Sequence, residues 1–248
     1  MSHYWKILYH ESFFIPEPTL TEKNCPDQTS RISIITGGNT GVGYQLCKIL
    51  YAHNGTVYLT SRNIEKGNTA IQKIKEAHPD SKGRLELLQL DLGDLTTIKK
   101  SAEEFQRKEK KLHFLCNNAG VMMPPAGSKT TQDYELQIGT NCIAPWLFSY
   151  LLKDTLVETA KTAPPNSVRV AWAGSAAIDL FSPSKIMNEQ GGVIVQKTPS
   201  SNYGISKVGN RYLAKGFADE TKGSGVVSVV CPDFPPSFVY TSSIQSRS

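Results

Sequence analysis

The sequence predicts an α/β protein in which a doubly wound parallel sheet lies between two layers of helices (α/β/α). Two observations support this fold class: short apolar runs alternate with longer stretches of helical periodicity, and a glycine-rich turn separates the first run from the first helix. The apolar runs are 32–36, 56–60, 85–90, 112–116, 168–173 and 226–231. The helical stretches are 41–53, 64–78, 94–108, 132–160 and 202–221.

Right-handed crossovers between these units predict the strand order 3-2-1-4-5-6. The length of 248 residues suits one large core. We therefore expect an N-terminal extension over 1–30, whose apolar start packs on the domain, and a single domain over 31–248. Ligands of such sheets bind beyond the carboxyl ends of the strands, so the residues that follow each apolar run are the candidates for a site.

Composition excludes several classes of protein. The chain has 27 Lys+Arg and 22 Asp+Glu, a formal net charge of +5, but no basic stripe or reading motif for nucleic acid. Five scattered cysteines without C-x-x-C pairs predict free thiols and no metal site, which suits a reducing, cytoplasmic location. No apolar run approaches the roughly 20 residues of a transmembrane helix, and peripheral membrane contact is left open.

The turn after the first apolar run has the pattern of a nucleotide-binding loop. It reads Thr36-Gly-Gly-Asn-Thr-Gly-Val-Gly43 and leads into a helix, so its backbone can approach a pyrophosphate at the helix N-terminus. The alternative is a glycine-rich turn without a ligand. The predicted cofactor contacts in this turn are Gly37, Asn39, Thr40, Gly41, Val42 and Gly43. A Walker loop is excluded because no Gly-Lys-Ser/Thr follows.

The ends of the second and third strands indicate which dinucleotide binds. The second strand ends at Thr60-Ser-Arg62-Asn63, without the Asp or Glu that would hold the ribose 2′-hydroxyl of NAD. Arg62 can instead bind a 2′-phosphate, so NADP (NADPH) is favoured over NAD; the alternative is a solvated surface arginine. Asp91 and Leu92 follow the third strand and are placed to border an adenine, although Asp91 can equally be a helix cap.

Two later segments carry groups suited to proton transfer. Tyr203 and Lys207 lie one turn apart on one face of a predicted helix, where a nearby ammonium lowers the pKa of a phenol from about 10. Tyr203 can then donate a proton to a nascent alkoxide or accept one from an alcohol. Ser175 follows the fifth strand and can hydrogen-bond a substrate oxygen as charge develops on it. The alternative for Tyr203 and Lys207 is an ordinary pair on a surface helix.

Over residues 17–231 the chain resembles the classical short-chain dehydrogenase/reductase family, nearest to retinol-dehydrogenase-like members found in filamentous fungi. The resemblance rests on Thr36–Gly43, Asp91-Leu92, Asn117-Asn-Ala-Gly120, Asn141, Ser175 and Tyr203-Gly-Ile-Ser-Lys207, in that order. It implies a Rossmann-type sheet, a nicotinamide cofactor, and oxidation or reduction at an alcohol or carbonyl carbon.

The resemblance also implies roles for individual residues. Lys207 would hydrogen-bond the nicotinamide ribose, and Asn141 would hold a water of the proton relay. The alternative for Asn141 is a residue that caps the helix or stabilises a kink near Pro145. Further cofactor contacts are implied for Asn117, Asn118, Ala119, Gly120, Tyr203 and Pro232.

The sequence departs from the family pattern after the sixth strand. Asp233 replaces the usual glycine after Pro232, Pro235-Pro236 prevents a regular helix, and few residues remain before Ser248. The segment between Ser175 and Tyr203 also diverges. We therefore expect a shortened substrate region with an open pocket and an uncovered sixth strand.

The favoured function is an NADP-dependent oxidoreductase that interconverts a secondary alcohol and a ketone, or an aldehyde, on a lipophilic small molecule. A tailoring step of fungal secondary metabolism is the expected setting, by analogy. The alternative is a non-catalytic NADP-binding sensor or scaffold protein. A small-molecule carbonyl or alcohol is the expected partner, and a homo-oligomer is left open.

Overall fold

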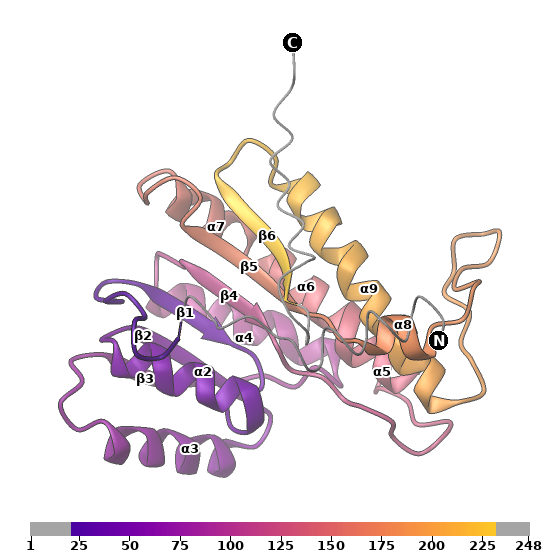
Figure 1. Cartoon of the computed structure of the whole chain (residues 1–248), viewed down its shortest axis with the longest axis horizontal. Helices are drawn as coiled ribbons and strands as arrows, with labels where there is room; N and C mark the ends of the chain where they lie inside the picture. Colours follow the sequence, from indigo (N-terminus) through magenta and orange to yellow (C-terminus); the bar gives the residue numbers. More distant parts are fainter. Residues whose placement is uncertain (1–20, 232–248) are drawn as a thin grey trace, which may run out of the picture.

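A six-stranded parallel sheet organises residues 21–231, the part of the chain that the computed structural model describes (Figure 1). The strand order β3-β2-β1-β4-β5-β6 confirms the predicted order. The strands are β1 (Ile32–Ile35), β2 (Thr56–Ser61), β3 (Arg84–Gln89), β4 (Phe114–Asn117), β5 (Val168–Ala173) and β6 (Val226–Cys231). Within the described residues, β3 and β6 form the two edges of the sheet.

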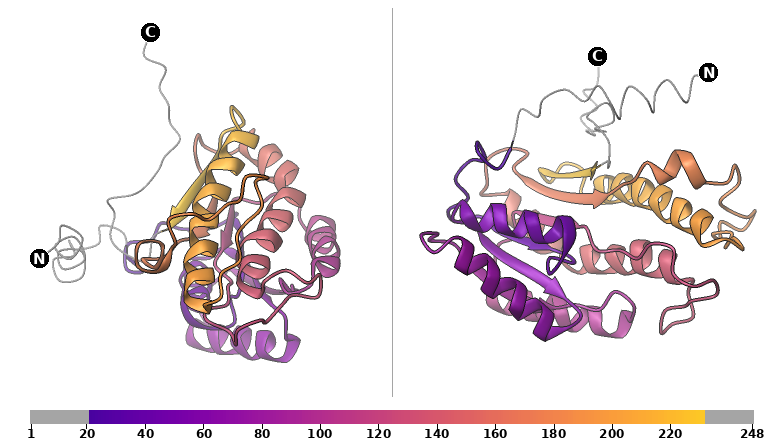
Figure 2. Two further views of the ribbon diagram at one scale, coloured as in Figure 1. Left: turned by 90° about the vertical axis from the view of Figure 1, so that its right-hand side faces the viewer. Right: turned by 60° about the horizontal axis from the view of Figure 1, so that its bottom comes forward.

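Helices connect successive strands and give the molecule three layers (Figure 2). The main helices are α2 (Gly41–Ala52), α3 (Ile64–Ala77), α4 (Leu95–Lys108), α6 (Ala144–Leu151), α7 (Lys153–Ala160) and α9 (Pro199–Glu220). The short elements are α5 (Leu136–Ile138), the π-helical turn η1 (Gly139–Ile143) and α8 (Ala177–Phe181). The predicted α/β/α class is therefore confirmed.

Each face of the sheet has its own hydrophobic core. Ile35, Val57 and Leu59 pack with Cys47 and Ile74 of α2 and α3 on one face. On the other face the core continues from β3 to α9 and includes the fully buried Trp172. Strands buried on both faces read as continuous apolar runs, which is why the sequence pattern located them well.

The prediction of one continuous helix over 132–160 is wrong. Helical structure begins only at Leu136, because Glu135 accepts hydrogen bonds from the N–H groups of Gln137 and Ile138 and so begins the first turn. The next turn, η1, is π-helical: the N–H of Ala144 bonds the carbonyl of Gly139, five residues back. Pro145 has no N–H for the α-helical bond to Asn141, which favours an irregular turn here.

Residues 21–30, the described part of the predicted extension, bond to the turn between α2 and β2. The N–H of Gln28 donates to the carbonyl of His53 at 2.7 Å, and the amide of Asn54 donates to Asp27 at 2.9 Å. The predicted packing of the first residues and the cofactor contact of Pro232 lie outside the described residues, as does the divergent tail.

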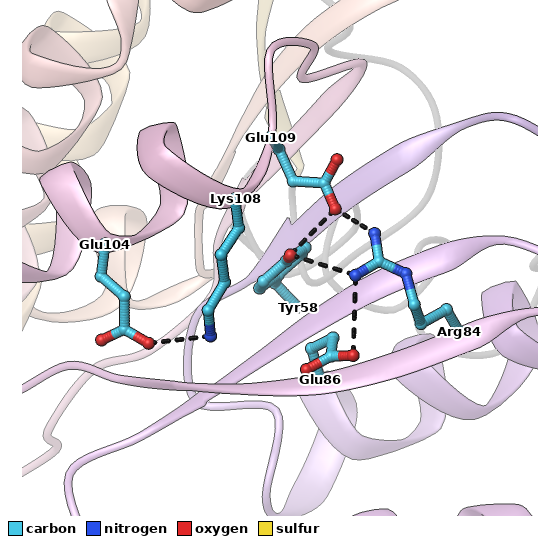
Figure 3. Close-up of polar contacts among 6 residues, drawn as sticks. All are labelled: Tyr58, Arg84, Glu86, Glu104, Lys108 and Glu109. Carbon is cyan, nitrogen blue, oxygen red and sulfur yellow. Dashed lines mark hydrogen bonds and ion pairs between the residues drawn. The ribbon is translucent and has the colours of Figure 1, made fainter.

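A polar cluster near the amino ends of β2 and β3 joins the edge of the sheet to the end of α4 (Figure 3). The buried Tyr58 hydroxyl donates to Glu109 at 2.9 Å, and Arg84 contacts both groups. Burial, then the bond to Glu109, raises the pKa of Tyr58 to about 12. The guanidinium Nη1 of Arg84 also lies 3.6 Å from the carboxylate Oε1 of Glu86. The cluster therefore fixes the β3 edge at the end of the sheet opposite to the strands' carboxyl ends.

Across residues 21–231, none of the helices combines the length and apolar character needed to cross a membrane. The same residues contain no group of three His, Cys, Asp or Glu side chains arranged to hold a metal ion.

Candidate functional site

The glycine-rich loop between β1 and α2 is shaped by its lack of side chains. Gly37 and Gly41 have φ values of +66° and +58°, which favour glycine. A Cβ on Gly43 would lie 2.6 Å from the carbonyl oxygen of Gly37, so the start of α2 can pack on the loop only without one. A Cβ on Gly41 would meet nothing within 4 Å, which leaves this side of the loop open to a ligand.

The open side of the loop coincides with the N-terminus of α2. Thr40 occupies the N-cap position, but its side chain makes no capping hydrogen bond to the first turn. Backbone N–H groups in the first turn of a helix need partners and attract anions. The loop Gly37–Gly43 therefore fits the pyrophosphate of a dinucleotide. Val42, in the first turn of α2, is 77% exposed.

Thr36, the buried last residue before the loop, joins it to the residues after β4. Its hydroxyl donates to the carbonyl of Cys116 at 3.1 Å and accepts from the N–H groups of Asn118 and Ala119, both at 2.9 Å. The Asn118 amide in turn donates to the carbonyl of Thr36 at 2.9 Å. The role of Thr36 could not be predicted from the sequence, because its partners lie about 80 residues further along the chain.

The residues predicted to bind the adenosine end lie at the carboxyl ends of β2 and β3. Arg62 is exposed directly after β2. The carboxylate of Asp91 accepts from the N–H of Gly93 at 2.8 Å, while Asp94 caps α4, so Asp91 shapes the turn and is not the helix cap. The side chain of Leu92 is buried in the core, which leaves only its backbone for a ligand.

A groove of about 530 Å³ continues from the glycine loop between α2 and α3. Its lining includes Asn39, Thr40 and Gly41 of the loop and the charged residues Glu65, Lys66 and Lys73 of α3. Sequence reasoning missed these lysines, although their spacing of seven residues places them on one face of a helix.

Lys207 is held beside the end of β5. Its buried ammonium donates to the carbonyl of Ala173 at 3.0 Å, and the amide of Asn210 donates to the same oxygen at 2.8 Å. The ammonium also lies 5.5 Å from the centre of the Tyr203 ring. Ser175 follows Ala173 by two residues, and its hydroxyl accepts from the N–H of Ala177 at 3.2 Å. The structure thus gathers Ser175 and the Tyr203–Lys207 pair at the carboxyl end of β5.

Gly204 allows the segment after Ser175 to pack against the turn that carries Tyr203. A Cβ on Gly204 would lie 2.9 Å from the backbone of Phe181 and Ser182 at the end of α8. The close approach packs the end of α8 against α9, and no sequence motif indicated this requirement.

Asn141 lies in the π-helical turn and is 2% exposed. Its side chain exchanges two hydrogen bonds with the backbone of Val121, at 2.8 and 3.0 Å, and donates to the hydroxyl of Ser206 at 3.0 Å. Asn141 therefore positions the loop after β4 against α9. A Cβ on Gly120 would lie 2.9 Å from the Asn141 carbonyl oxygen, which accounts for the glycine at that position.

The side chain of Asn117 bonds within the protein, which leaves its backbone for the implied cofactor contact. Its buried amide donates to the hydroxyl of Ser149 on α6 at 2.9 Å, so its side chain faces the helix layer. Asn118 and Ala119, by contrast, contact the glycine loop, and they connect the two halves of the site.

Comparisons with known proteins identify relatives of this chain. A family model described as short chain dehydrogenase matches residues 31–163. The chain is 48% identical over 214 residues to short-chain dehydrogenase/reductase pkfC of Emericella nidulans, covering 86% of this chain and 69% of that one. It is 42% identical over 225 residues to a short-chain dehydrogenase/reductase of Phomopsis amygdali, covering 87% and 65%. The chain thus spans about two thirds of each relative.

Solved structures share the fold. A protein from Mycobacterium paratuberculosis superposes with a TM-score of 0.68 at 25% identity, over 86% of this chain and 71% of that one. Pseudomonas aeruginosa RhlG superposes with a TM-score of 0.63 at 23% identity, over 82% and 70%.

Proposed function

The chain belongs to the short-chain dehydrogenase/reductase family, and from that premise we propose that it is an NADP-dependent oxidoreductase. It interconverts a secondary alcohol and a ketone, or an aldehyde, on a lipophilic small molecule. The observation that carries the proposal is the juxtaposition of Lys207 with the Tyr203 ring at the end of β5, in a chain whose glycine loop is open to a dinucleotide.

The dinucleotide binds along the carboxyl ends of β1 to β4. The loop at Gly37–Gly43, where the uncapped first turn of α2 supplies N–H groups, would hold its pyrophosphate. Lys207 and Tyr203 would hold the nicotinamide ribose. When bound, the nicotinamide supplies or accepts the hydride, so the protein provides placement and electrostatics.

The preference for NADP rests on positive charge at the adenosine end. Arg62 directly follows β2, and Lys66 lines the groove that starts at the glycine loop. These cations would hold the 2′-phosphate, and the position of Arg62 carries no carboxylate for a free 2′-hydroxyl. Glu65, which also lines the groove, is the one acidic side chain among the described residues of its lining. Proteins of this fold include some named as complexes with NADP or NADPH and one named as NADH-dependent, so the fold alone does not decide the cofactor.

Tyr203 is the group that moves the proton. In the reductive direction its hydroxyl donates to the alkoxide that forms on the substrate, and in the oxidative direction the phenolate accepts the proton of the alcohol. The Lys207 ammonium stabilises the phenolate, and the Ser175 hydroxyl donates to the substrate oxygen. Asn141 supports this arrangement by holding the neighbouring loop.

The substrate is lipophilic because exposed apolar side chains gather in the segments around Tyr203. Met122 and Met123 lie in the loop that Asn141 holds, and Leu180 and Phe181 lie on α8. These exposed apolar side chains support a lipophilic substrate. A tailoring step in fungal secondary metabolism is the proposed setting, and the relatives named above are fungal short-chain dehydrogenases/reductases.

Fluorescence titration with NADPH and NADH, followed by a panel of ketones and aldehydes monitored at the cofactor band, tests the proposal. Tighter binding of NADPH together with turnover of a lipophilic carbonyl is the expected result. Binding without turnover across the panel would favour the alternative of a non-catalytic NADP-binding sensor or scaffold.

A further inference from the structure

Two buried amide side chains, Gln137 and Asn141, lie one helical turn apart between the loop after β4 and α9. Gln137 is fully buried and Asn141 is 2% exposed. A buried amide side chain destabilises the fold unless it is hydrogen-bonded, so both residues need partners inside the protein. Both are hydrogen-bonded, and in the same manner.

Each amide accepts a hydrogen bond from the loop and donates one to α9. The Gln137 carbonyl oxygen accepts from the N–H of Met123 at 2.9 Å, and its nitrogen donates to the carbonyl of Pro199 at 2.8 Å. The Asn141 carbonyl oxygen accepts from the N–H of Val121 at 2.8 Å, and its nitrogen donates to the Ser206 hydroxyl at 3.0 Å.

The two amides bond to α9 on either side of Tyr203. Pro199 precedes Tyr203 by four residues, and Ser206 follows it by three. The Ser206 hydroxyl donates in turn to the backbone carbonyl of Tyr203 at 2.8 Å. Residues 121–123 are therefore held alongside the turn of α9 that carries the proposed proton donor.

Met122 lies between the two anchored residues and is 65% exposed. Its neighbours are held by their backbones, while its flexible thioether stays free to contact an apolar molecule. We propose that Gln137 and Asn141 form a clamp that fixes residues 121–123 as one wall of the substrate site. Gln137 is then a positioning residue, and Met122 is a substrate-contacting residue that selects for apolar substrates.

The clamp needs a side chain that donates and accepts at once. Methionine in place of Gln137 matches its length, but it leaves the Met123 N–H without its acceptor and removes the side-chain donor from the Pro199 carbonyl. A neutral imidazole has one donor and one acceptor, so Gln137→His is the variant that can restore both bonds. Gln106 offers a matched control, because its amide donates to the Leu151 carbonyl at 2.9 Å and joins α4 to α6 far from the loop.

Hydrogen–deuterium exchange of the full chain tests the clamp without requiring activity. In Gln137→Met, exchange over residues 121–123 should become about tenfold faster, whereas Gln106→Met should leave it unchanged. Recovery of slow exchange in Gln137→His would support the clamp. Exchange in Gln137→Met equal to that of the wild type would overturn it.

Steady-state kinetics test whether residues 121–123 form a wall of the substrate site, a claim that rests on the proposed function. Met122→Ala should raise the KM for a bulky lipophilic ketone at least fivefold while the Kd for NADPH stays the same, and Gln137→Met should do likewise. Met122 is exposed, so this variant tests the wall even if Gln137→Met does not fold. An unchanged KM in Met122→Ala would overturn the wall. If the wild-type chain turns over no substrate, the proposed function is wrong, and so is the role of residues 121–123 as a wall of the substrate site. The clamp is tested separately, by the hydrogen–deuterium exchange result.

Discussion

Replacing Thr36 with valine tests how the cofactor loop is held. The substitution keeps the shape of the side chain and removes only its hydroxyl. That hydroxyl makes three hydrogen bonds, one to the carbonyl of Cys116 and two from the N–H groups of Asn118 and Ala119. Because Thr36 is 0% exposed, water cannot replace these bonds where they face the interior.

The expected cost follows from the groups left unpaired. The N–H groups of Asn118 and Ala119 lose their partner, whereas the Cys116 carbonyl keeps its bond from the N–H of Thr36 at 3.0 Å. Unpaired buried groups cost about 1–3 kcal/mol each. Some of the cost is recovered by relaxation of the loops, so we expect a loss of about 2–4 kcal/mol in the free energy of unfolding. For a chain of this size the melting temperature should fall by about 4–16 °C.

Thermal unfolding and NADPH titration measure the two consequences. Thr36→Val should melt earlier and bind NADPH more weakly, because the glycine loop and the residues after β4 no longer move as one unit. Thr36→Ser keeps the hydroxyl and is the matched control, with NADPH binding near that of the wild type. A Thr36→Val chain that melts and binds NADPH like the wild type would refute this reasoning.

Three further predictions concern other parts of the molecule. Arg62→Ala should weaken NADPH at least tenfold and NADH little, measured by fluorescence titration; an equal effect on both would show that the 2′-phosphate lies elsewhere. Gly204→Ala places a methyl group 2.9 Å from the backbone of Phe181 and should destabilise the fold by about 1–3 kcal/mol in urea unfolding, whereas unchanged stability would mean that α8 packs differently. The raised pKa of Tyr58, about 12 against an ordinary 10.0, gives stability that is complete below pH 10 and lost as the pH rises to about 12. This loss, about 2 kcal/mol, should disappear in Tyr58→Phe, and equal alkaline unfolding curves for the two chains would contradict the assignment.

Periodic patterns in the sequence identified the fold because the sheet is buried on both faces. The strands over Val168–Ala173 and Val226–Cys231 lie where their apolar runs predict them. The region around Asn141 could not be predicted in this way. Its π-helical turn depends on Pro145 and on side-chain contacts to Val121 and Ser206, and helical periodicity does not register either effect.

The candidate site was predictable where it depends on local motifs and not where it depends on long-range contacts. The glycine spacing and the Tyr203–Lys207 spacing are local, and the structure places both groups at the carboxyl ends of the strands. Gln137 shows the limit of local motifs, since a glutamine near the start of a helix is unremarkable until its bonds to Met123 and Pro199 are seen.

The most direct test of the proposed chemistry is to measure turnover of a lipophilic ketone and the Kd for NADPH on the same preparations of wild type and Tyr203→Phe. The phenylalanine ring keeps the cation–π contact with Lys207 but cannot transfer a proton. We predict a loss of turnover of at least a thousandfold with the Kd for NADPH changed by less than about threefold. Turnover retained in Tyr203→Phe would contradict the assignment of Tyr203 as the proton donor.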